Sequence, residues 1–253
     1  MTPVDLRAFY RYCRPTFLTE WPEPLKALSF KTEPVFPNAD ETRALRSGPL
    51  WKGPVWGQAD AVVGGLLDKL REALGKLDSP AFVRLHTRSP KDSPLFQQHN
   101  GRVDHPWMAL VMLRESRRFH DDVDWLAHNH VLPVVALRTW TPIPKGLEFR
   151  CIVRHGECVG IAQRPVQGTR NRLLDRHAVA VQALLLQFTA ECVRRSGLAH
   201  AAFDLCLLRE AAADLTLRDI RLIEVNPWHR ATDFYAFDPR RPDDLDGSFR
   251  FDA

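Results

Sequence analysis

The stretch Ile223-Glu224-Val225-Asn226-Pro227-Trp228 places an acid and an amide two residues apart inside an apolar run, and Phe203-Asp204-Leu205 stands twenty residues before it. In a strand, alternate side chains face the same side of the sheet, so Glu224 and Asn226 share one face. A hairpin that carries Asp204 on its other arm brings three oxygen-bearing side chains together. Mg²⁺ prefers a few carboxylate or amide oxygens together with nucleotide phosphates, so the pattern predicts a magnesium–nucleotide site.

The same residues also have an ordinary structural interpretation. An Asp such as Asp204 at a strand end is often a cap or turn residue, and a pair such as Asn226-Pro227 often just ends a strand. In such a strand, Ile223 and Val225 are expected to pack behind Glu224 and Asn226.

The bulk composition allows a packed core and an anionic ligand. The chain has 253 residues, 45% of them hydrophobic, which is enough for one large domain or two small lobes around a cleft. Its formal net charge is +4, a mildly basic balance, and no run of Lys and Arg is long enough to form a nucleic-acid-binding arm.

The cysteines and the N-terminus predict a cytoplasmic protein. The five cysteines are scattered and form no CxxC pair, which favours reduced thiols over disulfides or a zinc site. Residues 1–14 contain no apolar segment typical of a signal peptide. No run approaches the roughly 18 apolar residues of a membrane span, so we expect no membrane partner; the oligomeric state stays open.

The expected elements alternate between strands and helices. Residues 1–58, rich in Pro and Trp, predict irregular structure, and Asp60 is a candidate cap for a helix to about Leu77. A second helical stretch covers 105–128. A third helix, over 176–196, is expected to bury Val181, Leu184, Leu185, Phe188 and Cys192 and to end at Gly197. The expected strands cover 81–85, 132–140, 147–153 and 158–163, followed by the last hairpin.

This order predicts an α+β fold with largely antiparallel sheets in two lobes. We expect an N-terminal lobe over residues 1–130, irregular in 1–58 and built of helix and strand in 59–130. The C-terminal lobe covers 131–240, and 241–253 form a polar tail.

The hairpin over residues 147–163 carries two arginines whose placement depends on its turn. A two-residue turn at His155-Gly156 puts Arg150 opposite Ile161 and Arg164 on the other face. A loop one residue longer pairs Glu148 with Arg164 and puts both on one face with Arg150. We favour the second arrangement, because a half-buried Arg needs an anion and suits planar recognition of phosphate. A Glu148–Arg164 salt bridge without a ligand is the alternative.

Other candidate residues are weaker taken singly. Arg84 and Lys91 add positive charge, although surface cations are common. His128-Asn129-His130 lacks the context of an HNH nuclease, and Gly64-Gly65 belongs to no phosphate-binding loop. No nucleophile elbow and no convincing general base are present, which leaves an acceptor undefined.

In their order along the chain, these segments resemble the Cdc123 (D123) family of the ATP-grasp superfamily. The segments that carry the resemblance, a little over half of the chain, are Phe82-Val83-Arg84-Leu85, Ser89-Pro90-Lys91-Asp92, Leu137-Arg138-Thr139-Trp140, Glu148-Phe149-Arg150-Cys151, Gly160-Ile161-Ala162-Gln163-Arg164, Asp204 and Glu224-Val225-Asn226-Pro227-Trp228.

The resemblance implies a two-lobed ATP-grasp fold with a nucleotide cleft between the lobes, and ATP and Mg²⁺ as cofactors. The metal ligands it implies are Asp204, Glu224 and Asn226. The charged groups it implies for catalysis are Arg150, Arg164 and Lys91. The ATP contacts it implies are Arg84, Lys91, Leu137, Arg138, Trp140, Arg150 and Arg164, with the strand ending at Leu137-Arg138 lining the adenine.

Two positions depart from the family pattern, which usually has Lys where Arg84 stands and often Asp where Glu224 stands. The geometry of an α-phosphate contact at Arg84 is therefore in doubt. Residues 1–58 match no part of the family, so the surface for a partner or substrate is unmatched.

Three functions are consistent with the resemblance. The main prediction is an ATP-dependent ligase that transfers phosphoryl or adenylyl to an unknown acceptor, an RNA end or a carboxylate of a protein or small molecule. The alternative is an assembly chaperone for a translation factor, since eukaryotic relatives help to assemble initiation factor 2 through its γ subunit. The third, a degraded nucleotide sensor, is disfavoured by the complete polar set. An Arg- and Ala-rich, Lys-poor composition suggests a bacterial source without that client.

Overall fold

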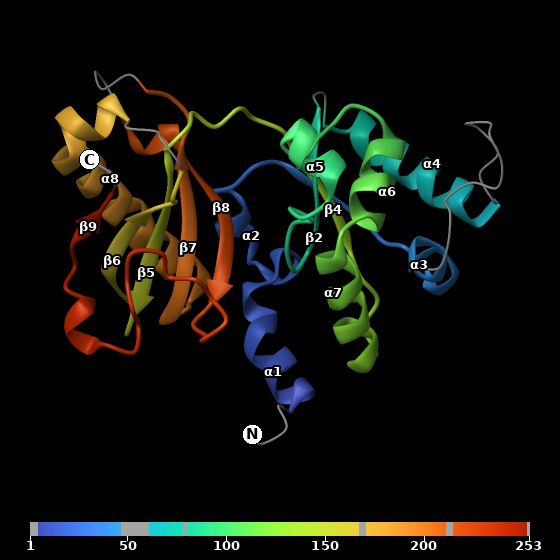
Figure 1. Ribbon diagram of the computed structural model, residues 1–253, viewed down its shortest axis with the longest axis horizontal. Coiled ribbons are helices and arrows are strands. Elements are labelled where there is room, and N and C mark those ends of the chain that lie inside the picture. Colours follow the sequence, from blue (N-terminus) through green and yellow to red (C-terminus); the bar gives the residue numbers. More distant parts are fainter. Residues whose placement is uncertain (1–4, 47–60, 78–79, 167–170, 211–214, 252–253) are drawn as a thin grey trace. The chain divides into compact units, whose positions relative to one another are not determined.

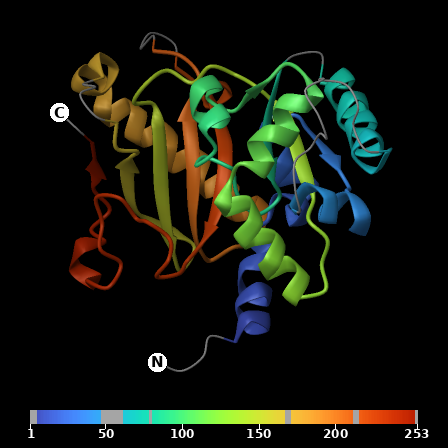
Figure 2. The same cartoon turned by 45° about the vertical axis from the view of Figure 1, so that its right-hand side comes forward.

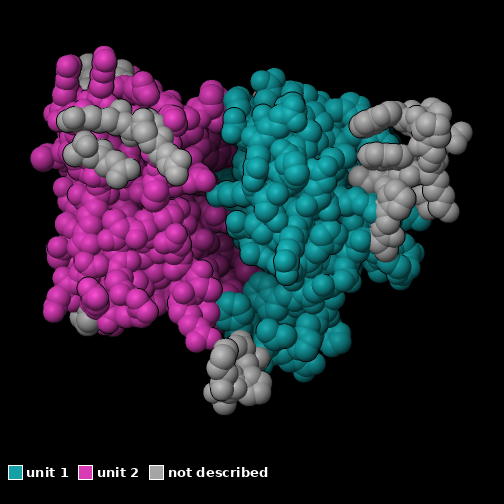
Figure 3. Space-filling model, viewed as in Figure 1, with its two compact units in different colours: residues 1–11, 31–140 teal, residues 12–30, 141–253 magenta. Residues whose placement is uncertain are grey.

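The computed structural model describes residues 5–46, 61–77, 80–166, 171–210 and 215–251. It divides into two compact units, coloured separately in Figure 3. Unit 1 takes the described residues up to Arg11 and those from Lys31 to Trp140, and unit 2 takes Tyr12–Phe30 and the described residues from Thr141 onward. The expected cap Asp60 and the tryptophans Trp51 and Trp56 lie outside the described residues.

Unit 1 contains a four-stranded antiparallel sheet in the order β1-β4-β2-β3. Its strands are β1 (Thr32–Val35), β2 (Ala81–Leu85), β3 (Arg102–Val103) and β4 (Val135–Thr139). Its helices are α3 (Ala39–Arg46), α4 (Ala61–Gly75), α5 (Pro94–His99), α6 (Pro106–Arg114) and α7 (Arg117–His128); α1 (Leu6–Cys13) begins the described chain. The predicted helical stretch 105–128 is thus two helices, because Ser116 caps α7 by accepting a hydrogen bond from the Phe119 N–H.

The core of unit 1 forms where alternate residues of β2 and β4 face the helices. Val83, Leu85, Val135 and Leu137 are at most 1% exposed and share one cluster with buried side chains of α4 and α6. The opposite face of the same strands carries Arg84 and Arg138, as the two-residue period of a strand requires.

Unit 2 contains a five-stranded sheet in the order β8-β7-β5-β6-β9, antiparallel except for the parallel β6–β9 pair. Its strands are β5 (Glu148–Arg154), β6 (Glu157–Gln163), β7 (His200–Leu207), β8 (Ile220–Pro227) and β9 (Phe249–Arg250). Its helices are η1 (Arg14–Thr16), η2 (Leu18–Glu20), α2 (Glu23–Lys26), α8 (Arg172–Ser196), η3 (Leu217–Asp219) and η4 (Pro242–Asp244). The predicted α+β class with largely antiparallel sheets is confirmed.

Helix α8 covers one face of this sheet (Figures 1 and 2). It starts four residues before the expected residue 176, because the Asn171 side chain accepts a hydrogen bond from the Leu173 N–H. Gly197 ends it in the left-handed conformation (φ 70°), as predicted. Of the five residues expected on the buried face, only Leu184 is half-buried instead of buried.

The opposite face of the sheet is covered by the C-terminal strap, which we define as residues 228–251. Phe234 and Phe237 of the strap are 3% and 5% exposed and pack against buried side chains of β5, β6 and β7. Beyond them, β9 pairs with β6. Residues 241–251, expected to belong to a polar tail, are therefore part of the fold, because β9 pairs with β6 and the Arg250 guanidinium lies on the Phe237 ring.

The division into units also differs from the expected boundary near residue 131. Strand β4 pairs with β1 and β2, so unit 1 continues through Trp140. Residues 12–30 belong to unit 2, where the Leu222 N–H donates to the Leu28 carbonyl (2.9 Å) and the Ser29 hydroxyl donates to the Leu222 carbonyl. Part of the segment predicted to be irregular thus binds to the edge strand β8 of the five-stranded sheet.

Gly160 tests how tightly the strap packs, because a Cβ at this position would meet the Phe237 ring at 2.8 Å. We expect Gly160→Ala to lower the free energy of unfolding by about 1–3 kcal/mol through overpacking. Gly64→Ala in α4 is the control: it meets nothing within 4 Å, and we expect a gain of about 0.5–1 kcal/mol in helix stability. Urea denaturation of both variants measures the difference, and equal effects would contradict the packing described here.

Candidate site on the five-stranded sheet

The β5–β6 hairpin has the shorter of the two turns considered from the sequence, but the strand register of the longer one. Its turn has two residues, His155 and Gly156, with φ of 54° and 82° as a primed hairpin turn requires. A register shift then makes Val159 an extra residue of β6, a β-bulge. The bulge restores the register of the longer loop, so Glu148 lies opposite Arg164. The favoured arrangement is confirmed, whereas the loop length behind it was wrong.

A second bulge aligns the polar residues of the last hairpin. Asp204 pairs with Glu224, but its neighbour Leu205 pairs with Leu222, which makes Ile223 the extra residue of β8. Leu222 is thereby buried in the core while Glu224 faces the other way. The expectation that Ile223 packs in the core behind Glu224 is wrong, because the bulge leaves Ile223 half-buried.

Three charged side chains consequently form one row across β5, β7 and β8. Arg150 is the register partner of Asp204, and Asp204 is the register partner of Glu224. Asn226 lies two residues further along β8 on the same face. The structure therefore brings together the three side chains predicted as metal ligands, with an arginine beside them.

The Arg150–Asp204 pair is the centre of this row. The Arg150 Nε and Nη2 groups donate to the two carboxylate oxygens of Asp204, each at 2.7 Å, and the side chains are only 8% and 14% exposed. Asn226 Nδ2 donates to Asp204 Oδ2 at 3.1 Å. Burial works to lower the pKa of Arg150, but the charge and hydrogen bonds of Asp204 outweigh it and raise that pKa. The guanidinium is therefore a permanent cation.

Glu148 and Arg164 form a second, looser pair on the same face. Arg164 Nη1 lies 2.7 Å from Glu148 Oε2, and the two side chains remain 39% and 31% exposed. A pair this exposed contributes about 0–1 kcal/mol to stability, so Arg164 can exchange Glu148 for another anion at little cost. The structure shows the Glu148–Arg164 salt bridge, and the contact of Arg164 with phosphate stays a prediction.

The donor set fits a hard divalent cation. Two carboxylates and an amide supply only oxygen ligands, the kind Mg²⁺ prefers. Asp204 offers about four lone-pair sites and uses three in hydrogen bonds to Arg150 and Asn226. The Asn226 nitrogen donates to Asp204, so the amide oxygen of Asn226 is the atom that would bind a cation. Among the described residues, no group of three or more His, Cys, Asp and Glu side chains could hold a metal ion, so a site here would take Asn226 as its third ligand.

The remaining predicted contacts belong to unit 1. Arg84 is buried, and its Nε and Nη2 groups donate to the carbonyls of Leu85 (2.9 Å) and Thr87 (3.2 Å). Arg138 is 3% exposed on the same face of the sheet. The Leu137 side chain points into the helical core, so only its backbone could contact a ligand.

The two other predicted contacts in unit 1 are Lys91, in a loop, and Trp140, at the end of a strand. Lys91 stands, half-buried, in the loop before α5, where its carbonyl accepts a hydrogen bond from the Gln97 side chain (3.1 Å). Trp140 follows β4, and the Arg102 guanidinium lies 5.3 Å from its ring centre. Their roles as ATP contacts stay predictions.

Tyr235 and Asp233 also contact Arg150, although neither is among the predicted site residues. The Tyr235 ring lies under the Arg150 guanidinium, 4.4 Å from ring centre to Cζ, and the Asp233 carbonyl accepts a hydrogen bond from Arg150 Nη1. The available signal was the concentration of three aromatic residues in Phe234-Tyr235-Ala236-Phe237, which indicates a segment that packs against the rest of the protein.

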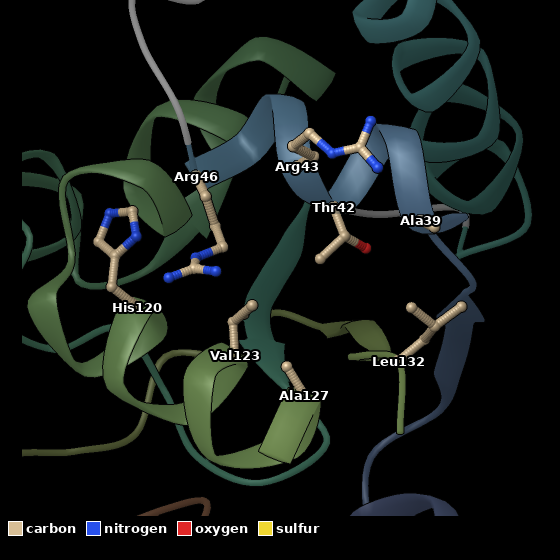
Figure 4. Close-up of a pocket in the computed structure, with 8 residues that line it drawn as sticks. All are labelled: Ala39, Thr42, Arg43, Arg46, His120, Val123, Ala127 and Leu132. Carbon is tan, nitrogen blue, oxygen red and sulfur yellow. The ribbon is translucent and has the colours of Figure 1, made fainter. Parts of the chain in front are cut away.

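Unit 1 also contains a pocket of about 640 Å³ (Figure 4). It is lined from α3 and α7 and by Leu132, and none of the predicted site residues contributes to it. Among the helices that the structure describes, none has both the length and the apolar character of a membrane span.

The buried pair yields a stability prediction. Asp204→Leu and Arg150→Met each leave one buried charge unpaired, so we expect each to cost about 3–5 kcal/mol, whereas the double variant costs less than the sum of the two. The exposed Arg43–Asp40 pair is the control, and the matched variants Arg43→Met and Asp40→Leu should each change stability by less than about 1 kcal/mol. Additive losses at Arg150 and Asp204 in chemical denaturation would contradict their coupling.

Comparison with known proteins identifies relatives over most of the chain. The model of the family described as D123 matches residues 60–241. A translation initiation factor eIF2 assembly protein from Dictyostelium discoideum is 22% identical over 180 residues, 68% of this chain and 45% of that protein. The protein of the same name from Xenopus laevis is 25% identical over 111 residues, 38% of this chain and 31% of that protein. The chain thus spans less than half the length of both.

The fold has a solved counterpart. C-terminally truncated Cdc123 from Schizosaccharomyces pombe aligns with a TM-score of 0.69 at 16% identity, covering 87% of this chain and 86% of that one. At this identity the alignment shows a shared fold. Since the family model matches well over half of the chain, the protein belongs to the D123 family.

Proposed function

We propose that this protein binds Mg-ATP through the row Arg150–Asp204–Glu224 and Asn226 and acts in the ATP-dependent assembly of a translation factor complex. The single observation that carries the ATP part is the convergence, from three strands, of two carboxylates, an amide and a permanently charged arginine on one sheet face. A triphosphate with its metal needs both signs of charge at once.

The roles of the residues follow from their chemistry. Asp204, Glu224 and Asn226 would hold Mg²⁺, which would neutralise charge on the phosphates. Arg150 and Arg164 supply fixed positive charge from the neighbouring strands, and Arg164 is the more exposed of the two. Arginine suits this position because its planar set of donors matches phosphate oxygens.

The names of the relatives favour assembly over the ligase that was the main sequence prediction. Both are called eIF2 assembly proteins, which implies a protein partner. A ligase also needs an acceptor and a group to activate it, and sequence reasoning found no convincing general base. We therefore rank ligation to an RNA end or a carboxylate second. A cytoplasmic location is part of the same proposal.

The metal assignment has a direct test. We expect Glu224→Gln, which keeps the shape and removes the charge, to weaken Mg-ATP binding at least tenfold in calorimetry. Stripping Mg²⁺ with EDTA should weaken ATP binding by the wild type and have little further effect on the variant. Glu157→Gln is the matched control and should bind normally, because Glu157 is exposed at the turn of the β5–β6 hairpin, in a different hairpin of the same sheet. Wild-type affinity in Glu224→Gln would remove Glu224 from the site.

Assembly and ligation differ in their products. We expect purified protein with labelled ATP to release little ADP or AMP in the presence of RNA 5′-phosphate ends or amino-acid pools. We also expect it to capture a subunit of a translation initiation factor in an ATP-dependent way. Stoichiometric AMP or ADP release that requires one of those acceptors would instead support the ligase. The Arg150→Met/Asp204→Leu double variant serves as the binding-deficient control, provided that circular dichroism shows it folded.

A further inference from the structure

The Arg150 guanidinium makes three hydrogen bonds and packs against one aromatic ring. A guanidinium has five N–H donors; two bind Asp204 and one binds the Asp233 carbonyl. Two of the five donors are left without a partner among the described residues. A buried N–H donor without a partner costs free energy because it has lost its hydrogen bonds to water. A bound anion that accepts from these donors would offset this cost.

The flat face of the same guanidinium rests on Tyr235. The ring centre lies 4.4 Å from Arg150 Cζ, within the range of a cation–π contact, and the arginine side chain is 8% exposed, which strengthens the contact. The plane of the guanidinium is thus fixed by the ring, and its rotation within that plane is fixed by Asp204. Together they determine where the two remaining donors point.

The backbone of Tyr235 is itself constrained to present the ring. Its φ is 55°, a left-handed conformation that a residue with a bulky side chain rarely adopts. The Asp233 carboxylate accepts a hydrogen bond from the Tyr235 N–H (2.8 Å), which holds this turn. Strain of this kind persists only where the surroundings enforce it, and it is concentrated at functional sites.

The rest of the strap supplies that enforcement. Phe237, two residues later, packs on Gly160, and the Arg250 guanidinium lies 3.9 Å from the Phe237 ring centre. Arg250 also bonds the Asp244 carboxylate (2.7 Å) and the Ala236 carbonyl (2.8 Å). Tyr235 therefore lies between the turn at Asp233 and the packed residue Phe237. Both hold its backbone in place, as a precisely arranged site requires.

The Tyr235 hydroxyl shares its surroundings with the charged groups of the site. Burial, followed by the charge of Asp204, raises the pKa of Tyr235 to about 12, against the opposing influence of Arg150 and Arg164. The phenol is accordingly neutral near pH 7, so the ring meets Arg150 without a negative charge that would compete with phosphate.

We propose that Tyr235 is a positioning residue, which aims the two unused Arg150 donors at the triphosphate of the bound nucleotide. This rests on the proposed Mg-ATP site and adds a residue to it. The recognised chemistry is the polyphosphate and not the base, so Tyr235 acts on any ligand that carries this group.

The test compares Tyr235→Leu, which removes the ring, with Tyr235→Phe, which keeps it. With Mg²⁺ present, Tyr235→Leu should weaken binding of ATP and of inorganic tripolyphosphate by the same factor, at least tenfold. Tyr235→Phe should stay within about twofold of the wild type for both probes. Tyr10→Leu, a ring removed in unit 1, is the control for non-specific effects and should bind normally. Thermal melts establish that each variant is folded.

The outcomes separate the inference from the function on which it rests. If the wild type binds neither probe, the proposed function fails. If the wild type binds both and Tyr235→Leu binds equally well, only the role of Tyr235 is refuted. A Tyr235→Phe variant as weak as Tyr235→Leu would also overturn the stacking role. If Tyr235→Leu does not fold, Tyr235→Gln, polar and without a ring, takes its place in the same comparison.

Discussion

A buried arginine–aspartate pair, Arg150 with Asp204, organises the functional face of unit 2. Neither group would be stable alone at this burial, so each requires the other and both require correctly registered strands. The pair also fixes Asn226 through a shared carboxylate oxygen and, through Arg150, the turn at Asp233. One interaction therefore joins three strands and the C-terminal strap.

Much of this face could be predicted from the sequence because strands obey a simple period. Glu224 and Asn226 are two apart, and the expectation that they share a face with Asp204 holds. The α+β class and the end of α8 at Gly197 were equally local inferences. A role that depends on a bound ligand does not follow from the period of a strand. The ATP contacts of Arg84, Lys91 and Trp140 therefore stay predictions.

What could not be predicted depends on contacts distant in sequence. The aromatic residues of Asp233-Phe234-Tyr235 indicate packing, but nothing local shows that the partner is Arg150, 83 residues before Asp233. The partition of residues 12–30 into unit 2 likewise depends on backbone bonds to β8. The bulges at Val159 and Ile223 have no composition signal, although each one determines which side chains share a face.

The bulge at Val159 has a consequence for how this family can diverge. Successive side chains of a strand point to opposite faces of the sheet. Deleting one residue between Arg150 and Arg164 would therefore move every later side chain of β6 to the opposite face. A change in the turn must therefore be compensated by a change in the bulge. A relative that lacks the bulge in β6 must have one more residue in the turn. Aligned homologues should conserve the total count between the two arginines more strictly than the identity of any residue in it.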